Sequence, residues 1–144
     1  MAKIQVFLDT DVIISSVLSQ TGASFKLINI SKVKKVISID IAVEIAQVTK
    51  RLNIKSDKPN AILRNVKIAN LSLFSQEVLK KYNDYVYDLN DSHVIAGAHL
   101  SKSRYLITHN IKHYKVNQIK DDFGIVVARP GNLLQYLRSI NLYK

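Results

Sequence analysis

Short apolar runs alternate with longer segments in which apolar residues recur at helical spacing. The runs at residues 4–8, 36–39, 105–107 and 125–127 are rich in β-formers and stop at polar residues, which predicts four buried strands. Leu71 and Leu73 indicate a further short strand. Because helical patterns separate these runs, the strands are expected to form a mostly parallel sheet that helices cover on both faces.

The segments between the strands carry recognisable helix signals. Thr10 or Asp11 can cap a first helix, which is expected to end at Gly22. Asp40 can cap a later helix, in which Ile41, Ile45 and Val48 fall on one face. Other helices are expected over residues 25–30, 61–69, 75–82 and 90–100. The polar residues 55–59 predict a loop.

A last helix is expected to begin at Pro130, because a missing N–H costs nothing in the first turn of a helix. Leu133, Leu134 and Leu137 form its apolar stripe. Together, these elements predict one domain over residues 1–144. Its fold class is α/β, with three α/β/α layers around a central sheet of four to five strands.

Composition narrows the class of protein. With 47% hydrophobic and 22% charged residues, the chain is neither disordered nor a coiled coil. It has no cysteine, which excludes disulfides, a zinc ribbon and a thiol nucleophile. The opening apolar run is broken by Asp9 and Asp11 and resembles no signal peptide, and no stretch reaches the roughly 20 residues of a membrane span. A cytoplasmic protein with no membrane partner is expected.

Charge points to an anionic partner. The 21 Lys and Arg residues outnumber the 11 Asp and Glu residues and give a formal charge of +10. Nucleic acid is the first expectation for so basic a chain, and an acidic membrane surface or protein is the second. Since acids are few, their positions become informative.

Several of these acids follow strands or open helices. Asp9 follows the first strand, Glu44 lies one turn into the helix after the second, and Asp91 opens a helix preceded by Asp88. Asn110 follows the strand at residues 105–107. Because the carboxyl ends of parallel strands meet at one edge of a sheet, these oxygens are expected to converge. Clustered oxygen ligands suit Mg²⁺ or Mn²⁺.

Each of these residues also has an ordinary structural explanation. Asp9 or Asp11 could cap the first helix, Asp88 or Asp91 could be a turn or cap residue, and Asn110 favours turns and caps. Glu44 could be a solvated helix residue. Only their joint placement, in a chain with few acids, favours a metal site.

The motifs around these residues resemble those of the PIN-domain nucleases, the family of the VapC-type toxins of toxin–antitoxin pairs. The resemblance is carried by FLDTDVIISSV, SIDIAVEIAQV, DLNDSHVIAGAHLSKSRYLITHNIKHY and VVARPGNLLQYL. Their order and spacing cover nearly the whole chain. The resemblance implies Mg²⁺- or Mn²⁺-dependent cleavage of RNA, a cognate antitoxin and a homodimer.

The resemblance also implies roles for individual residues. Asp9, Glu44 and Asp91 would be the catalytic carboxylates, and Asp88 and Asn110 would join them around the metal. Thr108 would support the site through its hydroxyl. The sequence departs from the family at Asn110, where Asp is more usual, and at Asp11, where many members have Asn. One negative charge is thereby relocated.

Basic residues near the fourth motif are candidates for holding RNA phosphates: Lys102, Arg104, Lys112 and Lys115. A lysine run is more often a solvated surface. His109 and His113 are spaced like a metal pair, but no third ligand is evident, so a surface or phosphate contact is expected. Tyr82, Tyr85 and Tyr87 could stack on bases, although packing is the expected fate. The first helix has a face that could pack against a second copy, formed by Ile13, Ser16, Val17 and Gln20.

Three functions follow. The first is a metal-dependent endoribonuclease, the toxin of a toxin–antitoxin pair. The second is a PIN-like module that binds RNA with weak or no catalysis, which Asn110 motivates. The third is a receiver-type regulatory domain, for which a clear phospho-acceptor Asp after a central strand is lacking.

Overall fold

The computed structural model describes residues 3–71 and 74–142, and its centre is a five-stranded sheet. The strands are β1 (Ile4–Leu8), β2 (Val33–Ile37), β3 (Lys67–Ile68), β4 (Tyr105–Ile107) and β5 (Val126–Ala128). Their order across the sheet is β3-β2-β1-β4-β5, and every neighbouring pair is parallel. The predicted mostly parallel sheet is therefore confirmed.

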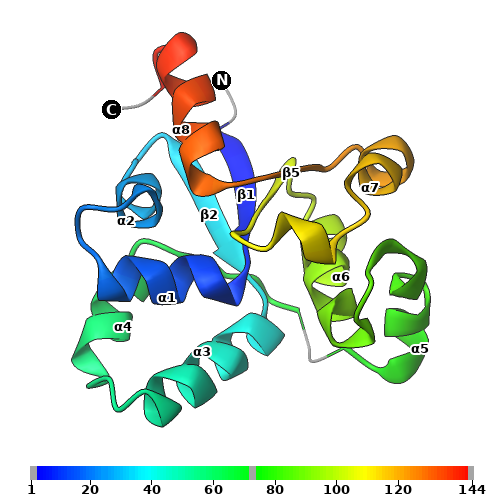
Figure 1. Ribbon diagram of the computed structural model, residues 1–144, viewed down its shortest axis with the longest axis horizontal. Coiled ribbons are helices and arrows are strands. Elements are labelled where there is room, and N and C mark those ends of the chain that lie inside the picture. Colours follow the sequence, from blue (N-terminus) through cyan, green and yellow to red (C-terminus); the bar gives the residue numbers. More distant parts are fainter. Residues whose placement is uncertain (1–2, 72–73, 143–144) are drawn as a thin grey trace.

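Helices cover both faces of the sheet (Figure 1). One set is α1 (Thr10–Leu18), α2 (Ala23–Ile28), α3 (Ile39–Arg51) and α4 (Asp57–Leu63), and α8 (Pro130–Ser139) packs against α2. On the other side lie α5 (Gln76–Lys80), α6 (Ser92–Leu100) and α7 (Val116–Phe123). The described part of the chain also has short 3₁₀ turns: η1 (Asn83–Tyr85), η2 (Leu89–Asp91) and η3 (Ile111–His113). The three-layer α/β/α class is confirmed.

The core lies between these layers. The side chains of Val6, Phe7 and Leu8 in β1 are fully buried, as are Leu106 and Ile107 in β4. Consecutive residues of a strand point to opposite faces, so full burial of a continuous run means that both faces of the central strands are covered. The continuous apolar runs in the sequence arise because helices cover both faces of these strands.

Chain direction across the sheet changes beside β1. The chain moves from β1 to β2 and β3 on one side, then crosses to β4 and β5 on the other. In open parallel sheets, the crevice beyond the carboxyl ends of the strands at such a reversal is where ligands bind. The neighbours at this point are β1 and β4, which are followed by Asp9 and Thr108. The strand order differs from the 2-1-3-4-5 order of receiver domains, which excludes the third function.

Helix boundaries near β1 and β2 differ from the predicted ones. Asp9 caps α1, because its carboxylate accepts the N–H of Thr10. This confirms the structural alternative for Asp9, whereas Thr10 and Asp11 lie inside the helix. The helix ends at Leu18, and Gly22 instead caps α2. Likewise β2 spans residues 33–37 and Ser38 caps α3, with Asp40 inside the first turn. Several polar side chains in these segments could cap a helix, and the sequence alone does not decide which of them does so.

The predictions for the middle of the chain were wrong in detail. A helix was expected over residues 61–69, but α4 begins at Asp57, because Pro59 is tolerated in a first turn. It ends at Leu63, and Lys67 and Ile68 then pair with β2 as β3. Leu71 follows β3 and belongs to no strand, and Leu73 lies outside the described residues.

Toward the C-terminus, α7 was missed, because only Ile119 in it is buried. The observed β5 is shifted by one residue from the predicted strand, and α8 starts at Pro130 as expected. Within the described part of the chain, no helix is long and apolar enough to cross a membrane.

Candidate metal centre

Asp9 lies at the carboxyl end of β1 and is held by three donors. Its Oδ1 accepts the backbone N–H of Thr10 at 2.8 Å, which fixes the start of α1. Its Oδ2 accepts the hydroxyls of Thr108 at 2.9 Å and Tyr114 at 2.7 Å. These contacts join residues about a hundred positions apart in the sequence, because β1 and β4 are neighbours. Asp9 is therefore oriented by the sheet and by η3 together.

Asp11 lies beside Asp9 and bonds to the segment that follows β4. Its Oδ2 accepts the side-chain N–H of Asn110 at 2.9 Å, and its carboxylate also accepts the backbone N–H of His109. Burial, helped by the nearby negative charge of Asp9, raises the pKa of Asp11 to about 6. The carboxylates of Asp9 and Asp11 therefore lie close enough to repel each other.

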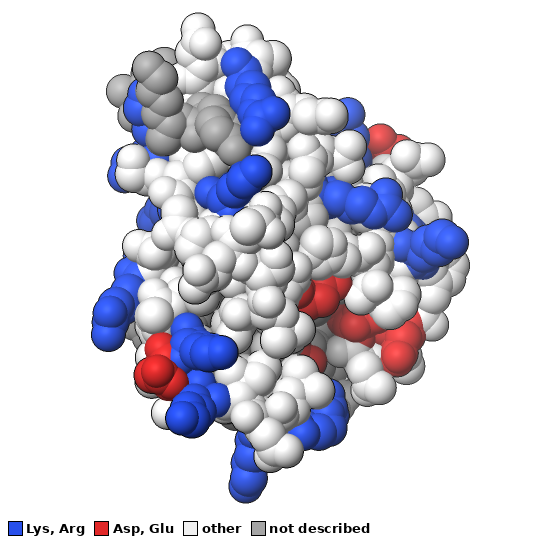
Figure 2. Space-filling view, turned by 60° about the vertical axis from the view of Figure 1, so that its left-hand side comes forward, with Lys and Arg blue, Asp and Glu red and all other residues white. Residues whose placement is uncertain are grey.

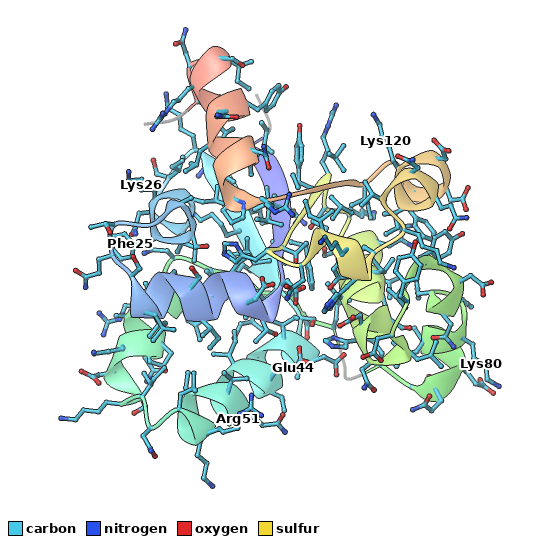
Figure 3. All side chains as sticks on the ribbon, in the orientation of Figure 1. Phe25, Lys26, Glu44, Arg51, Lys80 and Lys120 are labelled. Atoms are coloured by element: carbon cyan, nitrogen blue, oxygen red, sulfur yellow. The ribbon has the colours of Figure 1, made fainter. Side chains whose placement is uncertain are left out.

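Glu44 reaches the same region from α3. Its Oε1 accepts the hydroxyl of Thr10 at 2.8 Å and lies 3.4 Å from Nε2 of His93. Burial alone would raise the pKa of Glu44, but the His93 and Thr10 contacts outweigh it and lower the pKa. Figure 3 shows Glu44 toward the end of α3 that is nearer α6, with Arg51 at the other end.

His93 is the partner of Glu44 on α6. Burial opposes its charged form, but the Glu44 carboxylate outweighs this effect and raises the pKa of His93. Its Nδ1 is buried and has no hydrogen-bond partner among the described residues. The contact between Glu44 and His93 links α3 to the first turn of α6, which Asp91 directly precedes.

Asp91 stands just before α6, opposite Asp9. Its Oδ2 lies 3.4 Å from Nδ1 of His113. Burial, together with the charges of Asp9 and other neighbours, raises the pKa of Asp91. Asp88 is more exposed, and its Oδ1 accepts the N–H of Asn90 at 3.0 Å as the cap of η2. Its role as a cap is therefore established, and its role as a metal ligand stays a prediction.

One groove of about 540 Å³ collects most of these groups. Asp9, Asp11, Asp91 and Asn110 line it together, and Ile14, Leu18 and Val48 form its apolar side. Glu44 is joined to it through Thr10. Figure 2 shows acidic side chains gathered in one hollow of the face in view, with lysine and arginine side chains scattered around it. The structure thus brings the acids of distant motifs to one place.

The candidate phosphate-binding residues divide into two pairs. Lys112 and Lys115 follow Asn110 on the side of the carboxylates. Lys102 and Arg104 precede β4, and the N–H of Arg104 bonds to Gln5 near the amino end of β1. The extended chain from Arg104 to Thr108 advances by four residues along β4, which is about 13 Å. Lys102 and Arg104 therefore lie at the opposite edge of the sheet and do not surround the groove.

The structure also places the histidines and the first-helix face that the sequence singled out. Nε2 of His109 is hydrogen-bonded to the hydroxyl of Ser24, whereas His113 faces Asp91 and lines the groove, so the two rings have different partners. On α1, Ile13 and Ser16 are buried. They cannot form an outer face for a second copy, so that part of the expected dimer surface was wrong.

Three residues of the centre were missed in the sequence: Thr10, His93 and Tyr114. Each holds a carboxylate in place through a contact between distant segments. A tyrosine directly after a 3₁₀ turn, or a histidine two residues after an acid, gives no local signal of such a role. Only the neighbouring positions of β1, α3 and α6 reveal it.

The donor set fits a divalent cation in its chemistry. Carboxylate and amide oxygens are the ligands that Mg²⁺ and Mn²⁺ prefer. Burial, and after it the negative charge of Asp9, raises the pKa of Asp11 and of Asp91, and a bound cation would offset both effects. Within residues 3–71 and 74–142, no three acidic or histidine side chains are already arranged to enclose an ion.

Comparison with known proteins places the chain in a family. A family model described as the PIN domain matches residues 5–112, which is most of the chain. The protein therefore belongs to the PIN-domain family, whose members are generally nucleases, and the resemblance in its motifs is confirmed.

A solved structure shares the fold. It is described as the crystal structure of VapBC2 from Rickettsia felis bound to a DNA fragment from their promoter. The TM-score is 0.65 at 15% sequence identity, and the alignment covers 88% of this chain and 98% of that one. No curated protein sequence matches the chain.

Proposed function

We propose that this protein is a metal-dependent endoribonuclease that hydrolyses RNA phosphodiester bonds and acts as the toxin of a toxin–antitoxin pair. The observation that carries the proposal is the shared groove. Asp9, Asp11, Asp91 and Asn110 line it at the reversal point of a PIN-domain sheet, and Glu44 is tied to it through Thr10. Membership of a nuclease family and a fold shared with VapBC2 support this function.

In this proposal, Asp9, Glu44, Asp91, Asp88 and Asn110 would hold Mg²⁺ or Mn²⁺. When bound, such an ion activates water and neutralises charge on the phosphodiester. The chain itself supplies orientation. The hydroxyls of Thr108 and Tyr114 fix Asp9, and Thr10 fixes Glu44. Lys112 and Lys115 would contact RNA phosphates, which position a nucleic acid without reading its sequence.

The proposed partners follow from charge and family. An RNA substrate suits the formal charge of +10, and so does the acidic region of a cognate antitoxin. A homodimer is proposed on the family resemblance alone, and a cytoplasmic location on the absence of a signal-peptide or membrane-span pattern in the given sequence. Size-exclusion chromatography with light scattering would test the dimer.

The direct test is cleavage of end-labelled RNA by the purified chain with Mn²⁺ or Mg²⁺. We expect internal cuts that stop when EDTA is added. Undiminished cleavage in EDTA would reject the metal-dependent mechanism.

A second candidate function is RNA binding without efficient cleavage. Asn110 favours it, because the amide brings no charge and donates its N–H to Asp11 instead of facing the groove as an acid. Salt-dependent RNA binding, without any Mn²⁺ affinity in calorimetry, would favour this function over the nuclease.

Metal binding should raise thermal stability. A ligand that binds only the folded state at about 100 times its Kd contributes about 2.7 kcal/mol. We therefore expect Mn²⁺ to raise Tm and EDTA to reverse the rise, as measured by differential scanning fluorimetry. The same rise in Asp9→Asn would show that the ion binds elsewhere.

Tyr114→Phe should lower the cleavage rate by about 10-fold, the lower end of what losing an outer hydrogen bond to a metal ligand costs. The change removes only the hydroxyl that bonds to Asp9 at 2.7 Å. Tyr82→Phe is the matched control, because the buried Tyr82 also loses one hydrogen bond, to His99. Single-turnover kinetics should show normal cleavage in Tyr82→Phe. Equal losses in both variants would mean that Tyr114 acts only through stability.

A further inference from the structure

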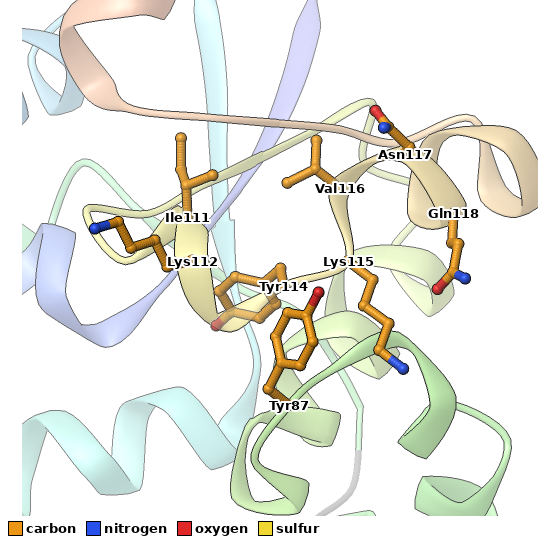
Figure 4. A pocket seen from close by; sticks show the side chains of 8 residues that line it. All are labelled: Tyr87, Ile111, Lys112, Tyr114, Lys115, Val116, Asn117 and Gln118. Atoms are coloured by element: carbon orange, nitrogen blue, oxygen red, sulfur yellow. The ribbon is translucent and has the colours of Figure 1, made fainter.

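A second hollow lies next to the groove of the metal centre. It has a volume of about 810 Å³, and its lining includes Tyr87, Lys112, Tyr114, Lys115, Asn117 and Gln118. Figure 4 shows these side chains around the hollow, with the ring of Tyr87 beside Tyr114 and Lys115. None of the described residues that line it is acidic. Its chemistry is therefore aromatic, cationic and amide.

Tyr87 is the unusual member of this hollow. Its side chain is 71% exposed, whereas Tyr82 and Tyr114 are buried. The expectation that the tyrosines pack in the core or an interface is thus met by Tyr82 and not met by Tyr87 in the chain alone. An exposed aromatic ring leaves apolar surface in water, which a stacked partner would cover.

Hydrogen bonds to a neighbouring segment fix the backbone at Tyr87. The N–H of Tyr87 donates to the carbonyl of His113 at 3.1 Å, and the N–H of Lys115 donates to the carbonyl of Tyr85 at 2.9 Å. Val86 and Tyr114 form the antiparallel bridge between these bonds. The backbone of Tyr87 is therefore hydrogen-bonded to the segment that carries Tyr114 and Lys115.

Positive charge lies beside the ring. Nζ of Lys115 stands over Tyr87, 5.5 Å from the ring centroid, and the exposed Lys112 lies on the same lining. The side chains of Asn117 and Gln118 add hydrogen-bond donors and acceptors. An aromatic ring next to lysines is the combination that binds single-stranded nucleic acid, by stacking on a base and contacting the backbone phosphates.

The hollow and the groove of the metal centre are lined by neighbouring residues of one segment. Tyr114 lines the hollow, and its hydroxyl donates to Asp9. His113, the preceding residue, lines the groove of the carboxylates. The hollow and the groove are therefore adjacent along this segment of the chain.

We propose that this hollow is a subsite for one unpaired nucleotide of single-stranded RNA, adjacent to the cleavage site. The base stacks on Tyr87, Lys112 and Lys115 contact phosphates, and Asn117 and Gln118 face the base edge. The inference rests on the proposed function for the identity of the RNA as substrate. A paired base cannot take this place, because stacking on protein needs a base that is free of its helix.

The test is RNA binding in EDTA, which separates binding from cleavage. A short fluorescein-labelled oligouridylate is titrated with the protein and followed by anisotropy. Tyr87→Ala should weaken binding about 10-fold, in the range for removal of one stacking aromatic, whereas Tyr87→Phe keeps the ring and should stay within about 2-fold. Tyr136→Ala is the control, because Tyr136 is another exposed tyrosine, on α8. It should bind as the unchanged chain does.

Two further measurements identify the contact. The chain has no tryptophan, so Tyr87→Trp introduces a single reporter whose emission should be quenched by the oligouridylate. Lys115→Met should reduce the slope of log affinity against log salt by about one. A duplex of the same length should bind equally to the unchanged chain and to Tyr87→Ala.

Equal affinity of Tyr87→Ala and the unchanged chain for oligouridylate overturns the subsite, and so does equal weakening in Tyr87→Ala and Tyr136→Ala. Binding that depends on Tyr87, without any cleavage in Mn²⁺, leaves the subsite standing and rejects the nuclease proposal. Cleavage in Mn²⁺ that is unchanged in Tyr87→Ala supports the nuclease proposal and rejects the subsite.

Discussion

Asp9→Asn should abolish metal-dependent RNA cleavage, with a loss of at least about 100-fold, beyond the 10- to 100-fold typical of losing an outer partner of a metal ligand. Asp9 is the carboxylate at the centre of the site, held by Thr10, Thr108 and Tyr114. Asn has the same shape but carries no charge. Its amide also places an N–H where one carboxylate oxygen now accepts hydrogen bonds, so the donors around it lose an acceptor.

The fold should survive this change, because Asn caps helices about as well as Asp. Asp57→Asn is the matched control, since Asp57 lies in the first turn of α4, away from the groove. Cleavage of end-labelled RNA in Mn²⁺ should be normal in the control and lost in Asp9→Asn, with similar circular dichroism for both. Retained cleavage in Asp9→Asn would remove Asp9 from the metal centre.

Gly97→Ala should destabilise the protein by about 2 kcal/mol, as overpacked cores do. A Cβ at Gly97 in α6 would lie 2.4 Å from Cζ and 2.8 Å from Cε2 of Phe7. Phe7 is fully buried in β1, two residues before Asp9. The ring can yield only by moving α6 or β1, so the loss outweighs the gain of up to about 1 kcal/mol from helix propensity.

Gly131→Ala is the matched control, because no heavy atom lies within 4 Å of the Cβ it would gain in α8. It should leave stability unchanged or slightly higher. Thermal melts should show Gly97→Ala lower by roughly 5 °C, given the few degrees per kcal/mol expected for a chain of this size. Phe7→Leu combined with Gly97→Ala should recover part of the loss relative to the sum of the two single changes. Equal Tm values for the two glycine variants would contradict the close packing of α6 on β1.

Local patterns in the sequence identified the elements whose signals are strong. The run at residues 4–8 became β1, residues 105–107 became β4, and Pro130 began α8. Where the local pattern was weak, the predicted elements were wrong. Lys67 and Ile68 are too short and too exposed to look like a strand, and they form one only because β2 offers them an edge.

The candidate site also has a part that local sequence predicted and a part that only the fold revealed. That Asp9, Asp91 and Asn110 lie at strand or helix ends follows from local sequence, and the parallel sheet predicted their approach. The roles of Tyr114 and His93 come from segments that meet only in the folded chain. Lys102 and Arg104 are the opposite case. They are close to Thr108 in sequence, but β4 lies between them and Thr108 and places them at the other edge of the sheet.

By itself, the sequence determined the alternation of strands and helices, the excess of positive charge and the acids at strand ends, because each is set by neighbours within a few residues. Only the tertiary structure decided which strands adjoin, and therefore which distant side chains touch. Thr108 and Asp9 are 99 positions apart and share a hydrogen bond. The physical reason is that sheet order depends on burial of the whole core, which no local pattern encodes.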